Sequence, residues 1–283
     1  MPNETFQIFD KKAEKLIKLG RPKIAFGLSK ANKEILESLK RGKKYADIVL
    51  VGPKEIKNVK GFDVVISNNP EARIASMLAY DEVNGIIRGT LDDLKTTGIY
   101  QKLTGEKGAV SLGLFKDPSG HKFFLNPIGN ADGWQKEERF SDTKKIAEFI
   151  RKWGIEPKIA VFTGRRHETY TRKKNIKKGI EGILNKTYEE AEWIVKNLKE
   201  KGYEAENWTI DLNPAVEADC NILVPTNGMV GNQIFRVLLF CGGKVLFGLR
   251  LGLSRCYGDN SRTEKDFESH IKYLAITINK NRQ

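Results

Sequence analysis

Residues 23–51 read KIAFGLSKANKEILESLKRGKKYADIVLV, and this stretch decides the fold. Its two apolar runs, residues 23–28 and 46–51, flank a helical pattern of apolar positions over residues 32–41. Continuous runs rich in Ile and Val that alternate with helices are typical of parallel strands with both faces covered. The stretch therefore predicts a strand, a helix and a second, parallel strand.

The same alternation continues outward along the chain. Further apolar runs predict strands at residues 62–67, 84–88, 158–162, 205–210, 221–224 and 244–247. Helical spacing predicts helices at residues 71–80, 141–153, 187–202, 232–239 and 267–278. The middle differs, because residues 109–115 and 122–125 read as an antiparallel hairpin. We therefore predict an α/β fold with mainly parallel sheets and flanking helices.

Local residues mark two helix boundaries. Gly154 directly follows a helical pattern and is suited to a left-handed C-cap. Thr187 is followed three residues later by Glu190, the spacing of a capping box. The second signal predicts a helix that starts at Thr187.

The net charge raises the question of a polyanionic partner. The chain has 49 Lys and Arg against 36 Asp and Glu, a formal charge of +13. The basic residues are spread over most predicted helices, with one dense cluster from Arg165 to Lys178. This distribution argues against nucleic acid, because solvated helix faces and an anionic small-molecule substrate explain it equally well.

The composition and the spacing of a few residue types also indicate the cellular compartment. No apolar run approaches the roughly 20 residues that cross a bilayer, and residues 1–4 lack the basic start of a secretory signal. Cys220, Cys241 and Cys256 form no CxxC pair, and the three histidines lie far apart. We therefore expect a soluble, cytoplasmic protein with reduced thiols, no membrane segment and no metal site.

Parallel sheets bind ligands beyond the carboxyl ends of their strands, so the candidates are residues that directly follow predicted strands. Thr163, Gly164, Arg165 and Arg166 follow the strand at 158–162. Backbone amides and two guanidinium groups there would suit a phosphate. A solvent-exposed basic loop explains the same residues equally well.

Two more loops follow predicted strands. In residues 225–232, Gly228 and Gly231 let the backbone approach a ligand, and Asn232 is placed to cap the next helix, which alone would explain it. Residues 126–130, which include Asn130, follow the hairpin and are most simply a turn.

A fourth loop combines a hydroxyl, a guanidinium and carboxylates. Ser254 and Arg255 lead towards Asp259, Glu264 and Asp266. Surface polar loops look alike, so this pattern alone is weak.

Two familiar sites are missing from the sequence. Gly27 stands alone after the first strand, so the glycine-rich loop that binds dinucleotides, or its analogue in common methyl-donor enzymes, is absent. The histidines lack HExxH spacing, which disfavours a metal hydrolase.

In their order along the chain, these motifs resemble the phosphate acetyltransferase and phosphate butyryltransferase family. The family has a strand ending at a proline and a Gly-Asn pair opening a helix, here Pro225, Gly231 and Asn232. A Gly-rich turn, a strand and a Leu-Ser-Arg motif follow, here residues 242–255. Within this superfamily the chain is most similar to the MtxX group of methanogenic archaea, methanogenesis marker proteins that carry the label of methyltransferase subunits.

The resemblance implies a two-lobed fold. Residues 1–108 with 244–283 would form one α/β lobe, residues 109–243 the other, and a ligand cleft would lie between them. It also implies a homodimer and a phosphate acyltransferase activity with coenzyme A as cosubstrate, without a tightly bound cofactor or a metal.

The resemblance further implies residue roles. Asp266 would be the base that deprotonates coenzyme A, with Asp259 and Glu264 as alternatives, and Ser254 and Arg255 would contact the acyl phosphate. Asn232 would orient a polar group, and the two arginines after the strand at 158–162 would attract the anionic cosubstrate. The implied substrate-binding residues are Asn232, Gly231, Thr163, Arg165, Arg166 and Asn130.

The chain departs from the family pattern at several points. Cys256 follows Ser-Arg where the family has Gly, and Asn126-Pro127 stands where the acetyltransferases have Asp-Cys. These changes leave an alternative function: a catalytically altered accessory or regulatory subunit in methanogenic methyl metabolism. Methyl transfer itself is disfavoured, because the methyl-donor loop is absent.

Overall fold

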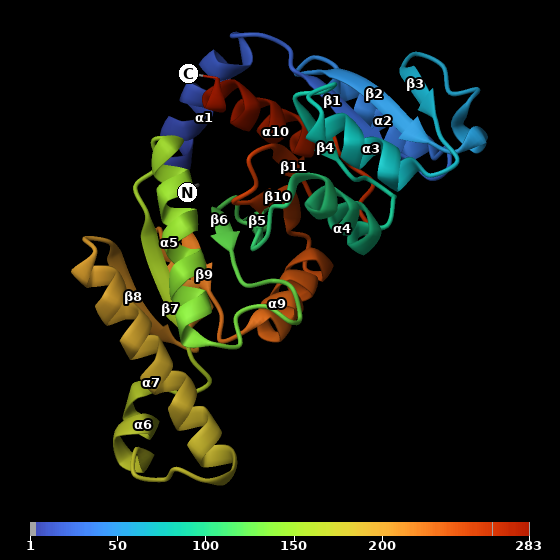
Figure 1. Ribbon diagram of the computed structural model, residues 1–283. Coiled ribbons are helices and arrows are strands. Elements are labelled where there is room, and N and C mark those ends of the chain that lie inside the picture. Colours follow the sequence, from blue (N-terminus) through green and yellow to red (C-terminus); the bar gives the residue numbers. More distant parts are fainter. Residues whose placement is uncertain (1–3, 262, 283) are drawn as a thin grey trace. The chain divides into compact units, whose positions relative to one another are not determined.

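The computed structural model describes residues 4–261 and 263–282 (Figure 1). Residues 1–3, which bear on the expected lack of a secretory signal, lie outside the described residues. The chain divides into two compact units: unit 1 comprises residues 1–9 and 111–245, and unit 2 comprises residues 10–110 and 246–283. Each unit is therefore assembled from separate stretches of sequence.

Unit 2 contains a mainly parallel sheet. Its strand order is β3-β2-β1-β4-β11-β10, in which only β10 runs antiparallel to its neighbour β11. The strands are β1 Lys23–Gly27, β2 Asp47–Gly52, β3 Asp63–Ile66, β4 Gly85–Ile87, β10 Lys244–Leu251 and β11 Cys256–Gly258. The helices are α1 Glu4–Ile17, which crosses the boundary between the units, α2 Lys33–Gly42, the 3-10 turn η1 Lys54–Ile56, α3 Pro70–Ala79, α4 Asp93–Thr104 and α10 Glu268–Asn281.

Alternating side chains of β1 show how this sheet is covered. Ala25 belongs to a core cluster with Ile74 and Leu78 of α3 and Tyr100 of α4. Its neighbour Phe26 points to the other face, where its ring lies 4.7 Å from that of Phe267, next to α10. Both faces are thus apolar, which confirms the strand, helix and parallel strand predicted from residues 23–51.

Unit 1 contains a second, mostly parallel set of strands. The order is β5-β6-β9-β7-β8, with β5 antiparallel to β6, which confirms the predicted hairpin. The strands are β5 Val110–Lys116, β6 Lys122–Leu125, β7 Lys158–Phe162, β8 Glu204–Thr209 and β9 Ile222–Val224. The helices are α5 Lys136–Lys152, α6 His167–Lys173, α7 Gly179–Glu200, α8 Leu212–Glu217 and α9 Gly228–Phe240.

Helices cover both faces of the unit 1 strands. Phe124 of β6 packs against Phe149 of α5 and Trp153. On the other face, Phe162 and Leu223 share a core cluster with residues of α8 and α9. Gly154 follows α5 with a φ of 78°, as its predicted role at the helix end requires.

Three predicted helix starts are wrong. Helix α5 begins at Lys136, five residues before the predicted start at residue 141. Helix α7 begins at Gly179, and Thr187 lies inside it, donating its hydroxyl to the Leu184 carbonyl and accepting from the Gly164 amide. Helix α9 begins at Gly228 with Asn227 as its cap, so Asn232 lies within the helix. In all three cases the true start lies in a polar or glycine-containing stretch that carries little periodic signal.

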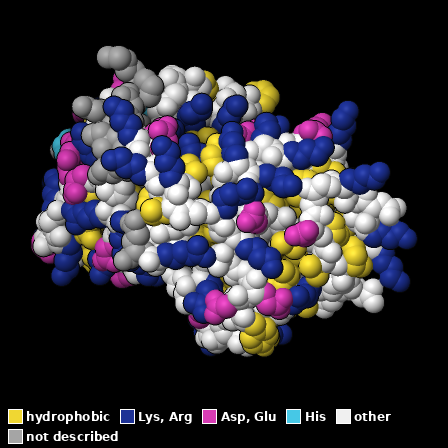
Figure 2. Space-filling model, turned by 90° about the horizontal axis from the view of Figure 1, so that it is seen from above, with side chains coloured by type: hydrophobic (Ala, Val, Ile, Leu, Met, Phe, Trp, Pro, Cys, Tyr) yellow, Lys and Arg dark blue, Asp and Glu magenta, His cyan; other side chains and the backbone are white. Residues whose placement is uncertain are grey.

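The face of the molecule drawn in Figure 2 carries its charge in a dispersed form. Figure 2 shows Lys and Arg side chains scattered over the face in view, with apolar and acidic side chains between them. Among the described helices, none is both long enough and apolar enough to cross a membrane.

Candidate functional site

Three of the predicted loops leave unit 1 at one edge. Strands β6, β9 and β7 are parallel neighbours, so residues 126–130, 225–228 and 163–166 follow them at the same carboxyl edge. This is the edge at which parallel sheets bind ligands. The structure thereby brings six predicted residues to one region of unit 1, and their roles in binding stay a prediction: Asn130, Thr163, Arg165, Arg166, Gly231 and Asn232.

The loops after β6 and β9 are joined by a hydrogen bond and by a close backbone approach. The Asn232 side-chain amide donates to the Ile128 carbonyl at 3.0 Å. A Cβ atom at Gly231 would lie 1.9 Å from the Pro127 carbonyl oxygen, so no larger residue fits there. Asn232 thus fixes the loop after β6 to α9 rather than capping the helix.

The loop after β7 is held just as firmly. The Thr163 hydroxyl oxygen accepts from the Arg165 amide at 3.0 Å and donates to the Arg165 carbonyl at 2.5 Å. The Gly164 amide donates to Thr187 on α7 at 3.0 Å. This turn presents two consecutive guanidinium groups at the edge of the sheet.

The two arginines differ in environment. Arg166 is exposed and forms a two-point ion pair with Asp211, both N···O distances being 3.0 Å. Arg165 is only 4% exposed and pairs with Glu181 on α7. Hydrogen bonds from Lys173 and Arg165 hold the pKa of Glu181 below its ordinary value.

Arg165 is incompletely satisfied. Its Nε and Nη1 atoms are buried and have no hydrogen-bond partner among the described residues. Buried guanidinium N–H groups without partners are costly, and native structures usually satisfy them with protein groups, water or an ion. The loop thus holds a fixed positive charge with unused donors, which suits an anion.

Ser254 and Arg255 lie elsewhere. They occupy the turn between β10 and β11, and because β11 runs parallel to β4 this turn is at the amino edge of the unit 2 sheet. Arg255 pairs with Asp81 at 2.6 Å, and the amide and hydroxyl of Ser254 both bond to Glu106. Carboxylates therefore engage both groups, at the edge opposite to the one where parallel sheets bind ligands.

The three carboxylates considered as the base have separate partners. Asp266 pairs with Arg41 at 2.8 Å, and Glu264 lies 3.7 Å from the His270 ring nitrogen. Burial opposes ionisation of Glu264, but interaction with His270 and with backbone amides outweighs it and lowers the pKa of this carboxyl. Neither of these carboxylates is brought to Ser254 or Arg255 by a hydrogen bond or ion pair among the described residues, and the catalytic roles stay predictions.

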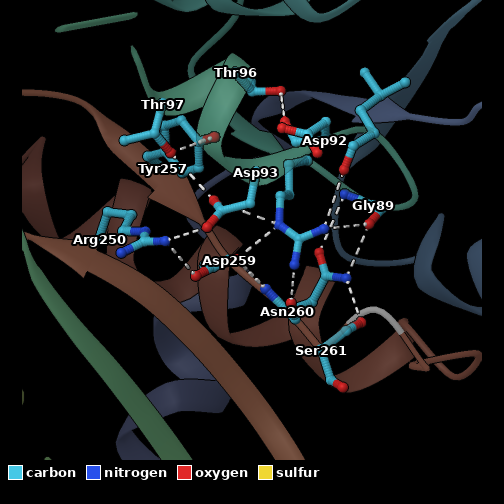
Figure 3. Close-up of polar contacts among 12 residues, drawn as sticks. Gly89, Asp92, Asp93, Thr96, Thr97, Arg250, Tyr257, Asp259, Asn260 and Ser261 are labelled. Carbon is cyan, nitrogen blue, oxygen red and sulfur yellow. Dashed lines mark hydrogen bonds and ion pairs between the residues drawn. The ribbon is translucent and has the colours of Figure 1, made fainter. Parts of the chain in front are cut away.

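The third carboxylate belongs to a buried network in unit 2 that sequence reasoning missed (Figure 3). Arg88 at the end of β4 bonds to Asp259 at 2.8 Å, and Arg250 of β10 contacts Asp93 at 2.6 Å and Asp259 at 3.1 Å. Burial, together with the charge of Asp259, raises the pKa of Asp93 against the opposing effect of the two arginines.

This network fixes two loops at the carboxyl edge of unit 2. The Asn260 side chain accepts from the Gly89 amide at 3.1 Å and donates to the Gly89 carbonyl at 2.9 Å, and Arg88 donates to the Asn260 carbonyl. The one available sequence signal was a second Ser-Arg pair, Ser261 and Arg262, directly after these residues. Arg262 lies outside the described residues.

Comparison with solved structures identifies the fold. A branched-chain phosphotransacylase from Enterococcus faecalis matches with a TM-score of 0.64 at 16% identity, covering 90% of this chain and 98% of the other. A phosphotransacetylase from Streptococcus pyogenes matches with a TM-score of 0.65 at 12% identity, covering 97% and 98%. At such low identity these matches show the fold alone, and they confirm the predicted α/β class.

Comparison of sequences gives the family. No family model matches the chain. A protein of Methanosarcina barkeri named "Putative methyltransferase mtx subunit X" is 30% identical over 270 residues, covering 93% of this chain and 96% of that protein. A protein of the same name from Methanosarcina mazei is 30% identical over 227 residues, covering 79% and 78%. The predicted resemblance is confirmed, and the chain belongs to the mtx subunit X family.

Proposed function

We propose that the protein binds a small phosphorylated anion at residues 163–166 and transfers its acyl group to coenzyme A. The observation that carries the proposal is Arg165, a buried guanidinium with two donors that no described residue uses. Arg166 adds an exposed positive charge beside it. The likeness of the fold to two phosphotransacylases supports the same reaction class.

In this reaction the thiolate of coenzyme A attacks the acyl carbonyl carbon. The carbon–sulfur bond forms, the bond from carbon to the phosphate oxygen breaks, and phosphate leaves with the electron pair. The thiol proton goes to a carboxylate base. Positive groups fixed at the phosphate stabilise the charge that it gains as it leaves, so the two arginines would act on the transition state.

The test is thioester formation from coenzyme A with acetyl, propionyl and butyryl phosphates, beside direct titration of phosphate. The Arg166→Gln variant should bind phosphate about tenfold more weakly, because a charge-assisted hydrogen bond contributes roughly 1.5–3 kcal/mol. Arg151→Gln is the matched control, since Arg151 forms an exposed ion pair with Glu156 in the same unit. Equal loss in both variants, or no phosphate binding at all, would refute the proposal.

A second function is an accessory or regulatory subunit that binds the ligand without turning it over. The placement of Ser254 and Arg255 favours it, because both lie at the amino edge of the unit 2 sheet, where Glu106 and Asp81 already contact them. Thermal stabilisation by coenzyme A or acyl phosphate without thioester formation would support this function. The relatives' name adds methyl transfer, for which titration with S-adenosylmethionine is the direct test.

We also propose a cytoplasmic homodimer. This follows from the resemblance to phosphate acyltransferases and from the composition of the chain. Sedimentation equilibrium at several concentrations tests the assembly, and a monomer throughout would refute it.

A further inference from the structure

Helix α9 is mostly apolar, but only one side of it is covered. Gly231 and Phe235 are buried in unit 1, and Leu238 packs partly against the same core cluster as Phe235. Successive helical residues are rotated by about 100°, so a second set of residues faces away from these three. The outward set is Met229, Val230, Gln233, Arg236, Val237 and Phe240. It forms one side of the helix from end to end, which we call the α9 face.

The α9 face is exposed and largely apolar. Phe240 is 92% exposed, Val237 59%, Met229 49% and Val230 36%. Single exposed apolar side chains are ordinary, whereas contiguous ones that share a surface mark an interaction site. These four side chains lie on one side of the same helix, with Gln233 between them. The α9 face therefore has the character of a contact surface.

The charge of the α9 face indicates its partner. Arg236 is the one charged residue in the sequence of α9, and its guanidinium lies 4.7 Å from the centre of the Phe235 ring, towards the border of the face. The whole chain has a formal charge of +13, so two copies repel each other over surfaces that carry many cations. The α9 face avoids most of this repulsion. A nucleic acid or an anionic membrane, by contrast, would need a cluster of cations here.

We propose that the α9 face packs against the same face of a second copy of the chain, about a two-fold axis close to Phe240. A two-fold contact uses the same patch on both copies, so an apolar face complements itself without opposite charges. Phe240 lies at the centre, because the binding energy of an interface concentrates in large aromatic side chains that become buried. This inference rests on the proposed homodimer and names its interface.

Sedimentation equilibrium of two variants tests the interface. Val237→Lys/Phe240→Lys places like charges of the two copies opposite each other, so the dissociation constant of the dimer should rise at least about 30-fold. The matched control is Leu94→Lys/Ile180→Lys, which also replaces two exposed apolar side chains and adds the same charge. It should dimerise as the wild-type protein does. All four side chains are exposed, so both variants should keep the wild-type midpoint of urea denaturation, which shows that they fold.

A spin label gives a second test without changing the α9 face. Cys241 is exposed, whereas Cys220 and Cys256 are buried, so a nitroxide reagent for thiols should modify Cys241. Cys241 directly follows Phe240, so the labels of two copies should lie close together and broaden each other's spectrum. Dilution with excess unlabelled protein should remove this broadening, which shows that it arises between copies.

The outcomes separate the inference from the proposals beneath it. A wild-type protein that is monomeric at every concentration would overturn the homodimer and the inference together. The inference alone would be overturned by a dimer that survives Val237→Lys/Phe240→Lys, that dissociates equally in the control variant, or that shows no broadening at Cys241. Thioester formation is measured separately, so the proposed reaction stands or falls by its own assay.

Discussion

Each unit holds a buried arginine just after a parallel strand, and the two are satisfied differently. In unit 2, Arg88 uses all three nitrogens, on Asp259 and on the carbonyls of residues 89, 91 and 260. In unit 1, Glu181 is the one partner of the Arg165 guanidinium among the residues that the structure describes. A fully paired guanidinium is part of the framework, whereas a partly paired one at a loop has capacity left for a ligand.

Removing the fully paired arginine should have the largest effect. Arg88→Met removes one of the two cations that contact Asp259 and leaves the carbonyls of residues 89, 91 and 260 without this donor. The free energy of unfolding should therefore fall by about 3–5 kcal/mol. Urea denaturation followed by circular dichroism measures this loss. A loss below 1 kcal/mol would mean that the network is not a support of unit 2.

Removing the partly paired arginine should cost less stability and more binding. Arg165→Met breaks a pair whose carboxylate is partly exposed and also removes two unpaired buried donors, so we expect a loss of about 1 kcal/mol or less. Phosphate affinity should fall at least tenfold in the same variant. Urea denaturation and phosphate titration of the same preparation measure both effects. A stability loss as large as that of Arg88→Met would mean that the two arginines do not differ in role.

The carboxyl partners should respond to pH in opposite directions. The pKa of Glu181 is lowered, so its stabilising contribution exists above its unfolded pKa and is lost as pH falls through the folded pKa. The pKa of Asp93 is raised, so its contribution exists below its unfolded pKa and is lost as pH rises through the folded pKa. As the pH is lowered, the melting temperature of Glu181→Gln should fall less than that of the wild-type protein. As the pH is raised towards neutrality, the melting temperature of Asp93→Asn should fall less than that of the wild-type protein. If the plots of melting temperature against pH ran parallel to the wild-type plot for both variants, the two opposite pKa shifts would be contradicted.

The smallest effect on stability is expected at Arg255. Its ion pair with Asp81 is largely exposed, so Arg255→Ala should change unfolding free energy by about 1 kcal/mol or less. The rate of thioester formation by the same variant tests the catalytic role of Arg255. If thioester formation is abolished while the fold stays intact, the catalytic role implied by the family resemblance gains support, and the turn between β10 and β11 must be part of the site.

The sequence predicted features that rest on local periodicity. Strand β1, helix α2 and strand β2 could be found because Ile, Val and Phe recur with the period of each element over consecutive residues. The loops after β7 and β9 were also predictable, since each follows a clear apolar run.

The unpredicted features depend on contacts between distant residues. Arg88 and Asp259 are 171 positions apart, and no local pattern connects them. Strand β11, Cys256–Gly258, has three residues like β4 and β9 but lacks their run of Ile, Leu and Val, so the residues that follow it were not recognised as the end of a strand. Ser254 and Arg255 were identified from the order of the Gly-rich turn, the strand and the Leu-Ser-Arg motif, and their roles stay predictions.

The way the chain passes between units also sets an order for biosynthesis. Unit 1 needs Phe6, whose ring lies 6.0 Å from that of Phe124, and its remaining residues end at 245. The first long stretch of unit 2, residues 10–110, precedes the long stretch of unit 1, but unit 2 lacks β11, the strand beside β4, until the ribosome has made residues 256–258, and lacks α10 until later still. Unit 1, whose long stretch comes second in the chain, can therefore complete its core first, and a nascent chain holds an unfinished sheet edge at β4 until residues 256–258 are made.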